Sequence, residues 1–305
     1  MYDLIIVGGG PAGMSASLVA LKEKIHFLLL TESGTISVDF FRHIIELKKY
    51  DYPHVDYPVA YQLIHAFNES VTKGYIPVKL EHVISIKKSS EFFSIKTNHA
   101  FYEAKSILIA TGRRCKKLED DLPVSAGCIH YCVFCDGSLF ENKMIAIIEA
   151  GKTGILSTLF MLRIARKIYV IEQTDEVNKD ETDPFILRLL EYNPHLEFLH
   201  NTALVAITGH SSYVLVKIRQ DGNERTILLD GLFSQIGYKP NIECIADSIL
   251  TNNKRELVID SFNMTSITGM FAAGDVTHIQ DKTVNVAMKE GEKAVYFCIG
   301  YLATT

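Results

Sequence analysis

Two cysteines separated by two residues are the part of this sequence best suited to chemistry. They lie in the run Cys132-Val133-Phe134-Cys135-Asp136-Gly137. This spacing lets two sulfurs approach disulfide distance without strain, and in such motifs one thiol ionises more readily than a free cysteine. Asp136 follows the second thiol and can donate a proton if burial favours its protonated form. These residue types therefore favour a redox dithiol that exchanges electrons with a cofactor.

Two other interpretations of the cysteines stay open. One is a metal site, because four potential ligands lie close together in the sequence: Cys128, His130, Cys132 and Cys135. Zinc sites, however, usually divide their ligands into two separated pairs. The other interpretation is a set of inert buried thiols. Cys128 is expected to be structural, and the cysteines that stand alone are expected to be core thiols: Cys115, Cys244 and Cys298.

Residues 4–32 have the pattern of a dinucleotide-binding segment, which would position a cofactor. The elements follow in the order of a strand at 4–7, the run Gly8-Gly9-Gly10-Pro11-Ala12-Gly13, a helix at 12–22, a strand at 25–30 and Glu32. Gly8 permits the tight turn, Gly10 lets the backbone approach a pyrophosphate, and Gly13 lets helix and strand pack closely. The helix N-terminus supplies amide donors for phosphate, and Glu32 is placed to bind a ribose. A purely structural glycine-rich turn is the alternative, which the flanking elements disfavour.

The same order of elements recurs over residues 144–172, but its turn is altered. The turn reads Ile148-Glu149-Ala150-Gly151-Lys152-Thr153-Gly154, so Glu149 replaces the first glycine. A carboxylate about 4 Å from a pyrophosphate costs on the order of 4 kcal/mol at an effective dielectric of about 20. The following strand ends at Glu172 without an arginine for the 2′-phosphate of NADP, although Glu172 suits the free ribose of NAD or FAD. The alternative is a domain that keeps the fold and has lost the ligand.

The composition fits a globular protein of about two domains. Of the 305 residues, 48% are hydrophobic and 22% charged, and the formal net charge is −5. This charge, without a cluster of Lys and Arg, argues against nucleic-acid binding. A strand-like run begins at Leu4, so no secretory signal is expected, and the apolar stretch at 294–303 is too short to span a bilayer. We therefore expect a cytoplasmic location without membrane association, where a cysteine pair is more often catalytic or metal-binding than structural.

The remaining segments predict strands and one further helix. Short strands are expected at 83–88, 92–97 and 106–110, and another at 270–273, with a helix from Val284 onward. The run Asp221-Gly222-Asn223 between two apolar segments, 214–219 and 226–229, predicts a β-hairpin.

Five segments in this order resemble the low-molecular-weight thioredoxin reductase family of flavoproteins, over essentially the whole chain. The matching segments are Gly8-Gly9-Gly10-Pro11-Ala12-Gly13, Ala110-Thr111-Gly112, Cys132-Val133-Phe134-Cys135-Asp136-Gly137, Ile236-Gly237-Tyr238-Lys239-Pro240 and Phe271-Ala272-Ala273-Gly274-Asp275-Val276. Each segment alone would be weak, but the ordered set is specific.

The resemblance implies an α/β fold with two Rossmann-like (three-layer ββα) nucleotide-binding domains, the second inserted into the first. The FAD-binding domain would comprise residues 1–114 and 246–305, and the central domain of NAD(P)H-binding type would comprise 115–245. By analogy Cys135 faces the flavin with Asp136 as acid and base, and Cys132 attacks the substrate disulfide. The implied FAD-binding residues are Gly8, Gly10, Pro11, Ala12, Gly13, Glu32, Ala110, Thr111, Gly112, Gly274, Asp275, Lys282, Thr283 and Val284.

The sequence departs from the family pattern at several places. The second glycine-rich turn and the basic cluster for NADPH are missing. A Gly-Gly-Gln loop expected soon after the second strand reads Ser33-Gly34-Thr35-Ile36-Ser37, and an Arg-Gln pair expected after Asp275 reads Lys282-Thr283. Both loops lie near the flavin in the family, so we expect a different environment for the ring.

The sequence therefore predicts a homodimeric FAD disulfide oxidoreductase that does not use NADPH efficiently. Electrons would come from a ferredoxin-type protein or through a second FAD in the central domain, and thioredoxin is the substrate that the resemblance implies. One alternative is an NADH-dependent disulfide reductase in which Glu172 selects the ribose. Another is a flavin-bound redox sensor that turns over poorly.

Overall fold

The computed structural model describes residues 1–32, 57–118, 129–148, 151–173, 190, 192–246 and 248–304. These residues form two compact units. The first unit contains the described residues up to Arg114 and from Lys239 onward, and the second contains those from Cys115 to Tyr238. The inserted α/β arrangement is confirmed, while the predicted limits at residues 245 and 246 stay a prediction. Cys128, Glu149 and the segment 33–37 lie outside the described residues.

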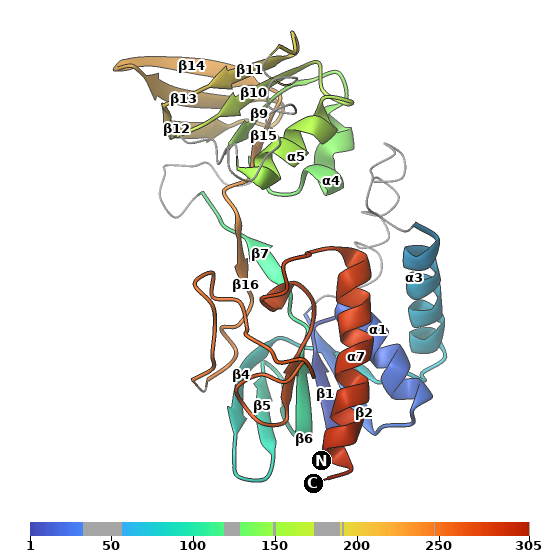
Figure 1. The fold of residues 1–305 in the computed structure, drawn as a ribbon. Helices are drawn as coiled ribbons and strands as arrows, with labels where there is room; N and C mark the ends of the chain where they lie inside the picture. The colour runs from blue at the N-terminus through green and yellow to red at the C-terminus, as the bar shows by residue number, and fades with distance from the viewer. Residues whose placement is uncertain are drawn as a thin grey trace. The chain divides into compact units, whose positions relative to one another are not determined.

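A mostly parallel sheet forms the centre of the first unit (Figure 1). Its order is β3-β2-β1-β6-β5-β4, with β17 also paired to β6; β4 and β5 are the antiparallel strands. Leu4, Ile5 and Ile6 of the central strand β1 are apolar and fully buried, so both faces of this strand are covered, as is typical of parallel sheets. The strands are β1 (Tyr2–Val7), β2 (Phe27–Thr31), β3 (Val78–Leu80), β4 (Val83–Lys88), β5 (Phe93–Thr97), β6 (Phe101–Ile109) and β17 (Met270–Ala272).

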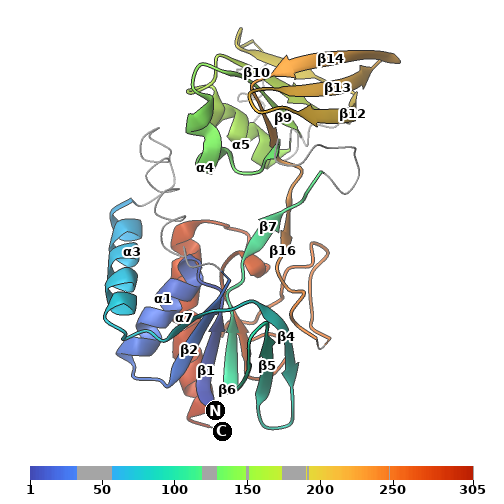
Figure 2. The same ribbon diagram turned by 180° about the vertical axis from the view of Figure 1, so that it is seen from behind.

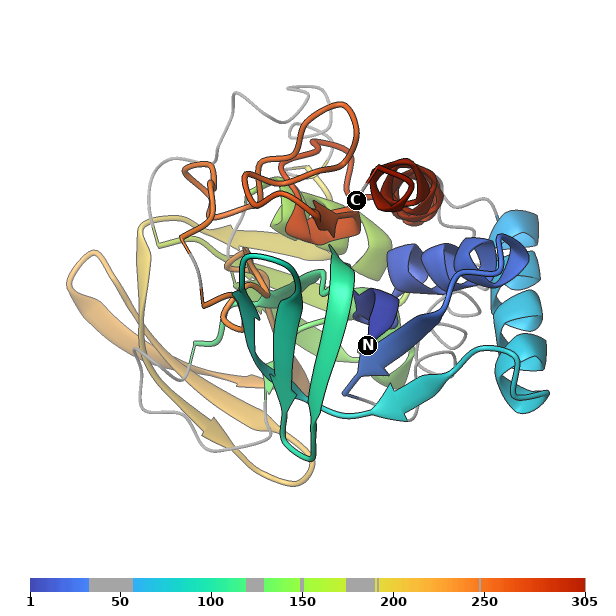
Figure 3. The same ribbon diagram turned by 90° about the horizontal axis from the view of Figure 1, so that it is seen from below.

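Three helices cover one face of this sheet: α1 (Pro11–Lys22), α3 (Tyr57–Thr72) and α7 (Val284–Leu302). They share a hydrophobic core with one side of the strands, and Figure 3 shows α1 and α7 side by side. The approach of these two helices is close, since a Cβ on Gly291 of α7 would lie 2.2 Å from the carbonyl oxygen of Ala12. The first turn of α1 therefore packs directly against the C-terminal helix α7. No helix of the described segments has the length and apolar character needed to cross a membrane.

The second unit contains a five-stranded parallel sheet with the order β11-β10-β9-β15-β8. A separate antiparallel sheet, β12-β13-β14, belongs to the same unit (Figure 2). The strands are β8 (Ile129–His130), β9 (Met144–Ile148), β10 (Lys167–Ile171), β11 (Leu196–Leu199), β12 (Thr202–Gly209), β13 (Val214–Gln220), β14 (Asn223–Leu229) and β15 (Gly231–Ser234). The helical elements are α4 (Val133–Asp136), the 3-10 helix η1 (Gly137–Phe140) and α5 (Lys152–Met161).

The predicted hairpin is confirmed and joins β13 to β14. Gln220 pairs with Asn223, and the two residues between them, Asp221 and Gly222, have φ values of 51° and 80°. Such a two-residue turn twists in the same sense as the strands it connects. Two shorter strands, β7 (Arg113–Cys115) and β16 (Tyr238–Pro240), pair where the chain passes from one unit to the other and back. A 3-10 helix, η3 (Gly274–Val276), follows β17.

Candidate active site

The two cysteines of the dithiol motif form a disulfide in the second unit. Their sulfurs are 2.15 Å apart and their Cα atoms 5.3 Å apart. Cys132 is the N-cap of the short helix α4, and its Sγ accepts a hydrogen bond from the amide of Cys135 at 3.1 Å. A Cβ on Gly137 would lie 2.9 Å from the Met161 sulfur, so glycine lets α4 pack against α5. Local helix geometry and this close packing therefore bring the two sulfurs together.

Asp136 is paired with a histidine that the sequence suggested only as a metal ligand. The Nδ1 of His130 donates a hydrogen bond to Oδ2 of Asp136 over 2.8 Å, and 38% of the Asp136 side chain is exposed. The sequence made the proton-donor role of Asp136 conditional on burial, and this side chain is only partly buried. Among the residues that the structure describes, no group of His, Cys, Asp and Glu is arranged to hold a metal.

The loop before the disulfide is held through the carbonyl oxygen of Tyr131. It accepts hydrogen bonds from Cys115 Sγ at 3.4 Å and from Gln235 Nε2 at 3.3 Å. Gln235 is buried, and its Oε1 accepts a hydrogen bond from Ser157 of α5 at 3.2 Å. Gln235 thus connects α5 and the end of β15 to the disulfide loop, a positioning role for which the sequence carried no signal.

Of the three cysteines predicted to be core thiols, only Cys298 is buried. Cys298 is buried beside Ser106, and burial raises the pKa of its thiol to about 11. Burial also raises the pKa of Cys244 to about 11, although this side chain is not fully buried. Cys115 is partly exposed too, because it lies in the short strand β7 rather than in a core.

The glycine-rich turn of the first unit combines two tight contacts with one open position. Gly8 has a φ of +110°, and a Cβ there would lie 2.2 Å from the carbonyl oxygen of Ala110. A Cβ on Gly13 would lie 1.9 Å from the carbonyl oxygen of Gly8, whereas a Cβ on Gly10 would have no atom within 4 Å. Gly10 is the N-cap of α1, and no side chain caps the helix amides. The turn therefore leaves open space in front of amides that can bind an anion.

The predicted ribose acid, Glu32, follows β2 and faces solvent. Its side chain is 72% exposed, and its Oε1 lies 2.6 Å from Nδ1 of His82. The segment after β6 is fixed by Asn241, which donates to the carbonyl oxygen of Thr111 at 2.9 Å and accepts a hydrogen bond from the Thr111 hydroxyl at 2.6 Å through its backbone carbonyl. Gly112 adopts a φ of +64° next to this contact.

Asp275 and Lys282 both form ion pairs within the first unit. Asp275 pairs with Nε of Arg113 at 3.0 Å. The Lys282 ammonium lies 3.0 Å from Glu256 and also donates to the carbonyl oxygens of Thr277 and Asp275. Lys282 therefore stabilises the turn that carries Asp275. The sequence suggested neither Arg113 nor Glu256, because both are distant along the chain from their partners.

Helix α7 begins next to this turn, at the predicted site residues Thr283 and Val284. The Thr283 hydroxyl caps the helix by accepting a hydrogen bond from the amide of Val286 at 3.3 Å. Oδ1 of Asn285 is buried and has no hydrogen-bond partner among the described residues. An open glycine turn, uncapped helix amides and this orphan oxygen are groups that a bound dinucleotide would satisfy. The residues present therefore fit FAD.

The corresponding acid of the second unit is turned inward. Glu172 follows β10, and only 3% of its side chain is exposed. Its Oε2 accepts a hydrogen bond from His200 Nδ1 at 2.6 Å. The sequence predicted Glu172 as a ribose-binding residue, but it did not indicate this pair, which depends on the adjacent strands β10 and β11.

Comparisons with known proteins agree with this arrangement. The family described as Pyridine nucleotide-disulphide oxidoreductase matches residues 2–291. The F component of alkyl hydroperoxide reductase from Staphylococcus aureus (strain MRSA252) is 29% identical over 99% of this chain and 59% of its own length. NADH dehydrogenase of Bacillus subtilis (strain 168) is 28% identical over 99% of this chain and 58% of its own. The chain thus spans about three-fifths of the curated relatives it matches.

Solved structures share the fold over its full extent. Thioredoxin reductase of Lactococcus lactis has a TM-score of 0.77 at 23% identity and covers all of both chains. Thioredoxin reductase of T. acidophilum has a TM-score of 0.73 at 25% identity and covers 98% of each chain. These likenesses support the two-unit fold described above.

Proposed function

Because this chain belongs to the pyridine nucleotide-disulphide oxidoreductase family, we propose that it passes two electrons from FAD through Cys132 and Cys135 to a protein disulfide of the thioredoxin type. Membership of this family makes the chain an enzyme, an FAD/NAD(P)-dependent disulfide oxidoreductase of thioredoxin reductase type. The observation that carries the proposal is the Cys132–Cys135 disulfide beside Asp136. The homodimer and the cytoplasmic location expected from the sequence are parts of the same proposal.

The first unit would hold FAD, which when bound supplies a carrier of two electrons. The uncapped amides of α1 would bind its pyrophosphate, and the exposed carboxylate of Glu32 would bind a ribose. Asp275, oriented by Arg113, and the orphan oxygen of Asn285 would bind polar groups of the other half. Lys282 supports this site indirectly by fixing the turn of η3.

The dithiol would then act by thiol–disulfide exchange. Two electrons break the Cys132–Cys135 bond and leave two thiolates, one of which takes a proton from Asp136. The Cys132 thiolate attacks the substrate disulfide, forms a mixed disulfide and releases one substrate thiolate. Cys135, which holds the proton from Asp136, loses it through Asp136 to the departing substrate sulfur as its own sulfur attacks Cys132, and this restores the Cys132–Cys135 disulfide. By analogy with the family, Cys135 would receive the electrons and Cys132 would react with the substrate.

The electron source that we propose is not NADPH. Glu172 is buried and bonded to His200, so it is not presented to a ribose, and Gln173 follows it where an arginine would bind a 2′-phosphate. A ferredoxin-type protein, or a second FAD in the central unit, would deliver the electrons instead. Both routes leave the dithiol chemistry unchanged.

A second candidate is an NADH-driven reductase. One relative is named NADH dehydrogenase, and an acid at the end of the second strand is the group that binds an unphosphorylated ribose. In this version Glu172 must leave His200 and turn outward. The burial of the Glu172 carboxylate and its hydrogen bond to His200 favour the first candidate, because turning Glu172 outward would break this bond.

Variants of the two cysteines test the proposed dithiol role. The FAD-loaded protein is reduced anaerobically with one equivalent of dithionite and mixed with oxidised thioredoxin, and the thiols formed on thioredoxin are counted. Cys132→Ser and Cys135→Ser should each lower the rate by at least about a thousandfold, because neither can form the disulfide. Cys244→Ser is the matched control and should retain the wild-type rate. Either serine variant with more than a tenth of that rate would contradict the proposal.

A further inference from the structure

Opening of the disulfide needs a proton, and the carboxyl group next to Cys135 is hydrogen-bonded to an imidazole. Aspartate side chains in contact with water are ionised near neutral pH, whereas imidazole binds and releases a proton between about pH 5 and 8. The Asp136 side chain is 38% exposed, and the group bonded to it is the imidazole of His130. The structure thus places a side chain suited to hold a proton against the one that would transfer it.

The His130 ring is held in one orientation by aromatic neighbours. It packs edge-on against Phe140, with ring centroids 4.9 Å apart, and lies 5.4 Å from the ring of Phe233. Its backbone is paired with Phe233 in the parallel sheet. The ring is 28% exposed, so the bond to Asp136 is partly shielded from water. These contacts keep Nδ1 directed at the carboxylate.

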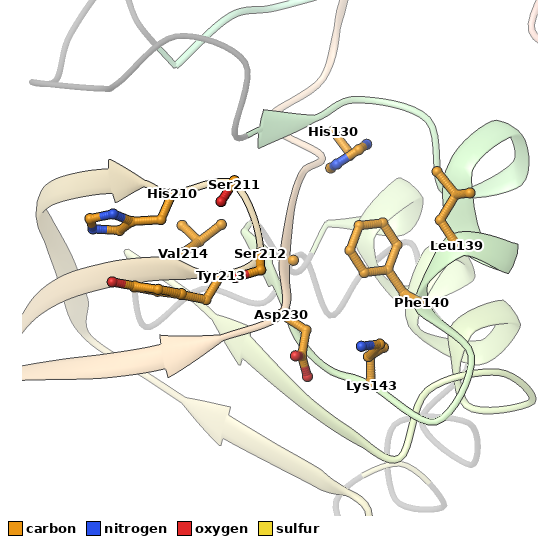
Figure 4. A pocket seen from close by; sticks show the side chains of 11 residues that line it. His130, Leu139, Phe140, Lys143, His210, Ser211, Ser212, Tyr213, Val214 and Asp230 are labelled. Carbon is orange, nitrogen blue, oxygen red and sulfur yellow. The ribbon is translucent and has the colours of Figure 1, made fainter.

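His130 also lines a polar pocket of about 270 Å³ in the second unit (Figure 4). The other titratable groups of this pocket are Lys143, His210, Tyr213 and Asp230. Among the residues that the structure describes, Asp136 on α4 is the charged group bonded to the ring itself. The imidazole therefore has a carboxylate on one side and a polar opening on the other, through which it can regain a proton.

We propose that His130 is a positioning residue that holds the proton for disulfide opening and passes it through Asp136. This inference rests on the proposed dithiol function. As the sulfur–sulfur bond breaks, the proton moves from Nδ1 of the imidazolium to Oδ2 of Asp136. Asp136 in turn protonates the departing thiolate, which becomes a thiol. The neutral imidazole then takes up a proton through the pocket, and the next cycle begins.

The test measures disulfide opening by dithiothreitol, which needs neither flavin nor protein substrate. Thiols formed in the purified protein are trapped by alkylation and counted by mass spectrometry between pH 5.5 and 8.5. Rates are compared as the ratio of wild type to variant, so the titration of dithiothreitol itself cancels. Because the assay bypasses FAD, a failure of the electron route proposed above would not affect it.

His130→Asn keeps a hydrogen-bond donor near Asp136 and removes the titrating ring. The ratio of wild-type to variant rates should be at least about tenfold at pH 6 and approach one by pH 8.5. Asp136→Asn, which keeps His130, should show the same pH dependence of the ratio. His210→Asn changes the other histidine of the pocket and should give a ratio near one throughout. A ratio for His130→Asn that is the same at every pH, or a wild-type profile in Asp136→Asn, would overturn the proposal.

Discussion

The two strand–turn–helix–strand segments of this protein share their backbone plan and differ at the side chains that would meet a nucleotide. In both, the first strand pairs in parallel with the second, β1 with β2 and β9 with β10. Both helices begin at a glycine N-cap without a capping side chain, Gly10 for α1 and Gly151 for α5. Both second strands are followed directly by a glutamate whose oxygen lies 2.6 Å from a histidine Nδ1.

The two glutamates nevertheless have opposite environments. The side chain of Glu32 is 72% exposed, whereas that of Glu172 is 3% exposed. The acid of the pair is therefore exposed to a ligand in the first unit and buried in the second, where His200 remains 47% exposed. The glutamate after the second strand can thus either bind a nucleotide or stabilise the unit. Its exposure distinguishes these two roles.

Substitution of the turn glycines should have the largest effect on stability. Gly13→Ala should destabilise the first unit by about 3 kcal/mol or more, because the added Cβ would meet the Gly8 carbonyl oxygen at 1.9 Å. Gly10→Ala has open space, so stability should change by less than about 0.5 kcal/mol while FAD affinity falls about tenfold. Thermal unfolding with and without added FAD separates the two effects.

Gly151→Ala in the second unit is the matched control for Gly10→Ala. If the second turn holds no nucleotide, this variant should bind FAD with wild-type stoichiometry and affinity. Loss of half of the bound flavin in Gly151→Ala would instead show that the second unit carries a flavin of its own.

Substitution of the two strand-end acids should have smaller effects, on stability for Glu172 and on FAD affinity for Glu32. Glu172→Gln should lower the free energy of unfolding by about 1 kcal/mol, since it weakens the part-buried hydrogen bond between Glu172 and His200. Glu32→Gln should leave stability within about 0.5 kcal/mol and weaken FAD binding several-fold. Denaturant unfolding and FAD titration of both variants measure these two effects. A stable Glu172→Gln with altered nicotinamide binding would mean that Glu172 serves a ligand.

The smallest effect concerns the acid side of the pH–stability profile. Burial raises the pKa of Glu256, but hydrogen bonds from Asn252 and Lys282 outweigh it and hold this pKa below its usual value of 4.5. A lowered pKa in the folded state adds stability above pH 4.5, which is lost as the pH falls through the folded value. Glu256→Gln should therefore be less stable than wild type at pH 7, by about 1 kcal/mol. The difference should shrink below pH 4.5.

Glu224 of the second unit is the comparison for Glu256. Hydrogen bonds from Lys217 and Arg219 lower its pKa as well, but this ion cluster lies at the surface of β13 and β14. Water and salt screen such pairs. Glu224→Gln should thus have a smaller effect that disappears in high salt, and urea unfolding at pH 7, 5 and 4 checks both variants.

Local patterns made much of the fold predictable. The apolar run of β1, the glycines before α1 and the Asp221-Gly222 turn each impose their structure over a few residues. The disulfide was predictable for the same reason, because a helical turn relates residues 132 and 135. Element ends were less predictable: the strand expected at 106–110 is β6, which begins at Phe101 and ends at Ile109.

The contacts between distant residues could not be predicted. Arg113 with Asp275, Gln235 with Tyr131 and Glu172 with His200 are each brought together by strands that are far apart in the chain. Nor did the sequence show whether Glu32 or Glu172 would be exposed, since both follow a run of buried apolar residues. Exposure at a strand end depends on which elements pack beyond it.

The proposed division of roles is that the first unit binds a flavin while the second does not use a nicotinamide nucleotide. Its most direct test is an anaerobic titration of the FAD-loaded protein with NADPH and, separately, with NADH, followed by the visible absorbance of the flavin. The flavin should stay oxidised for minutes with either nucleotide and should be bleached at once by dithionite. Stoichiometric bleaching within seconds by either nucleotide would contradict this division.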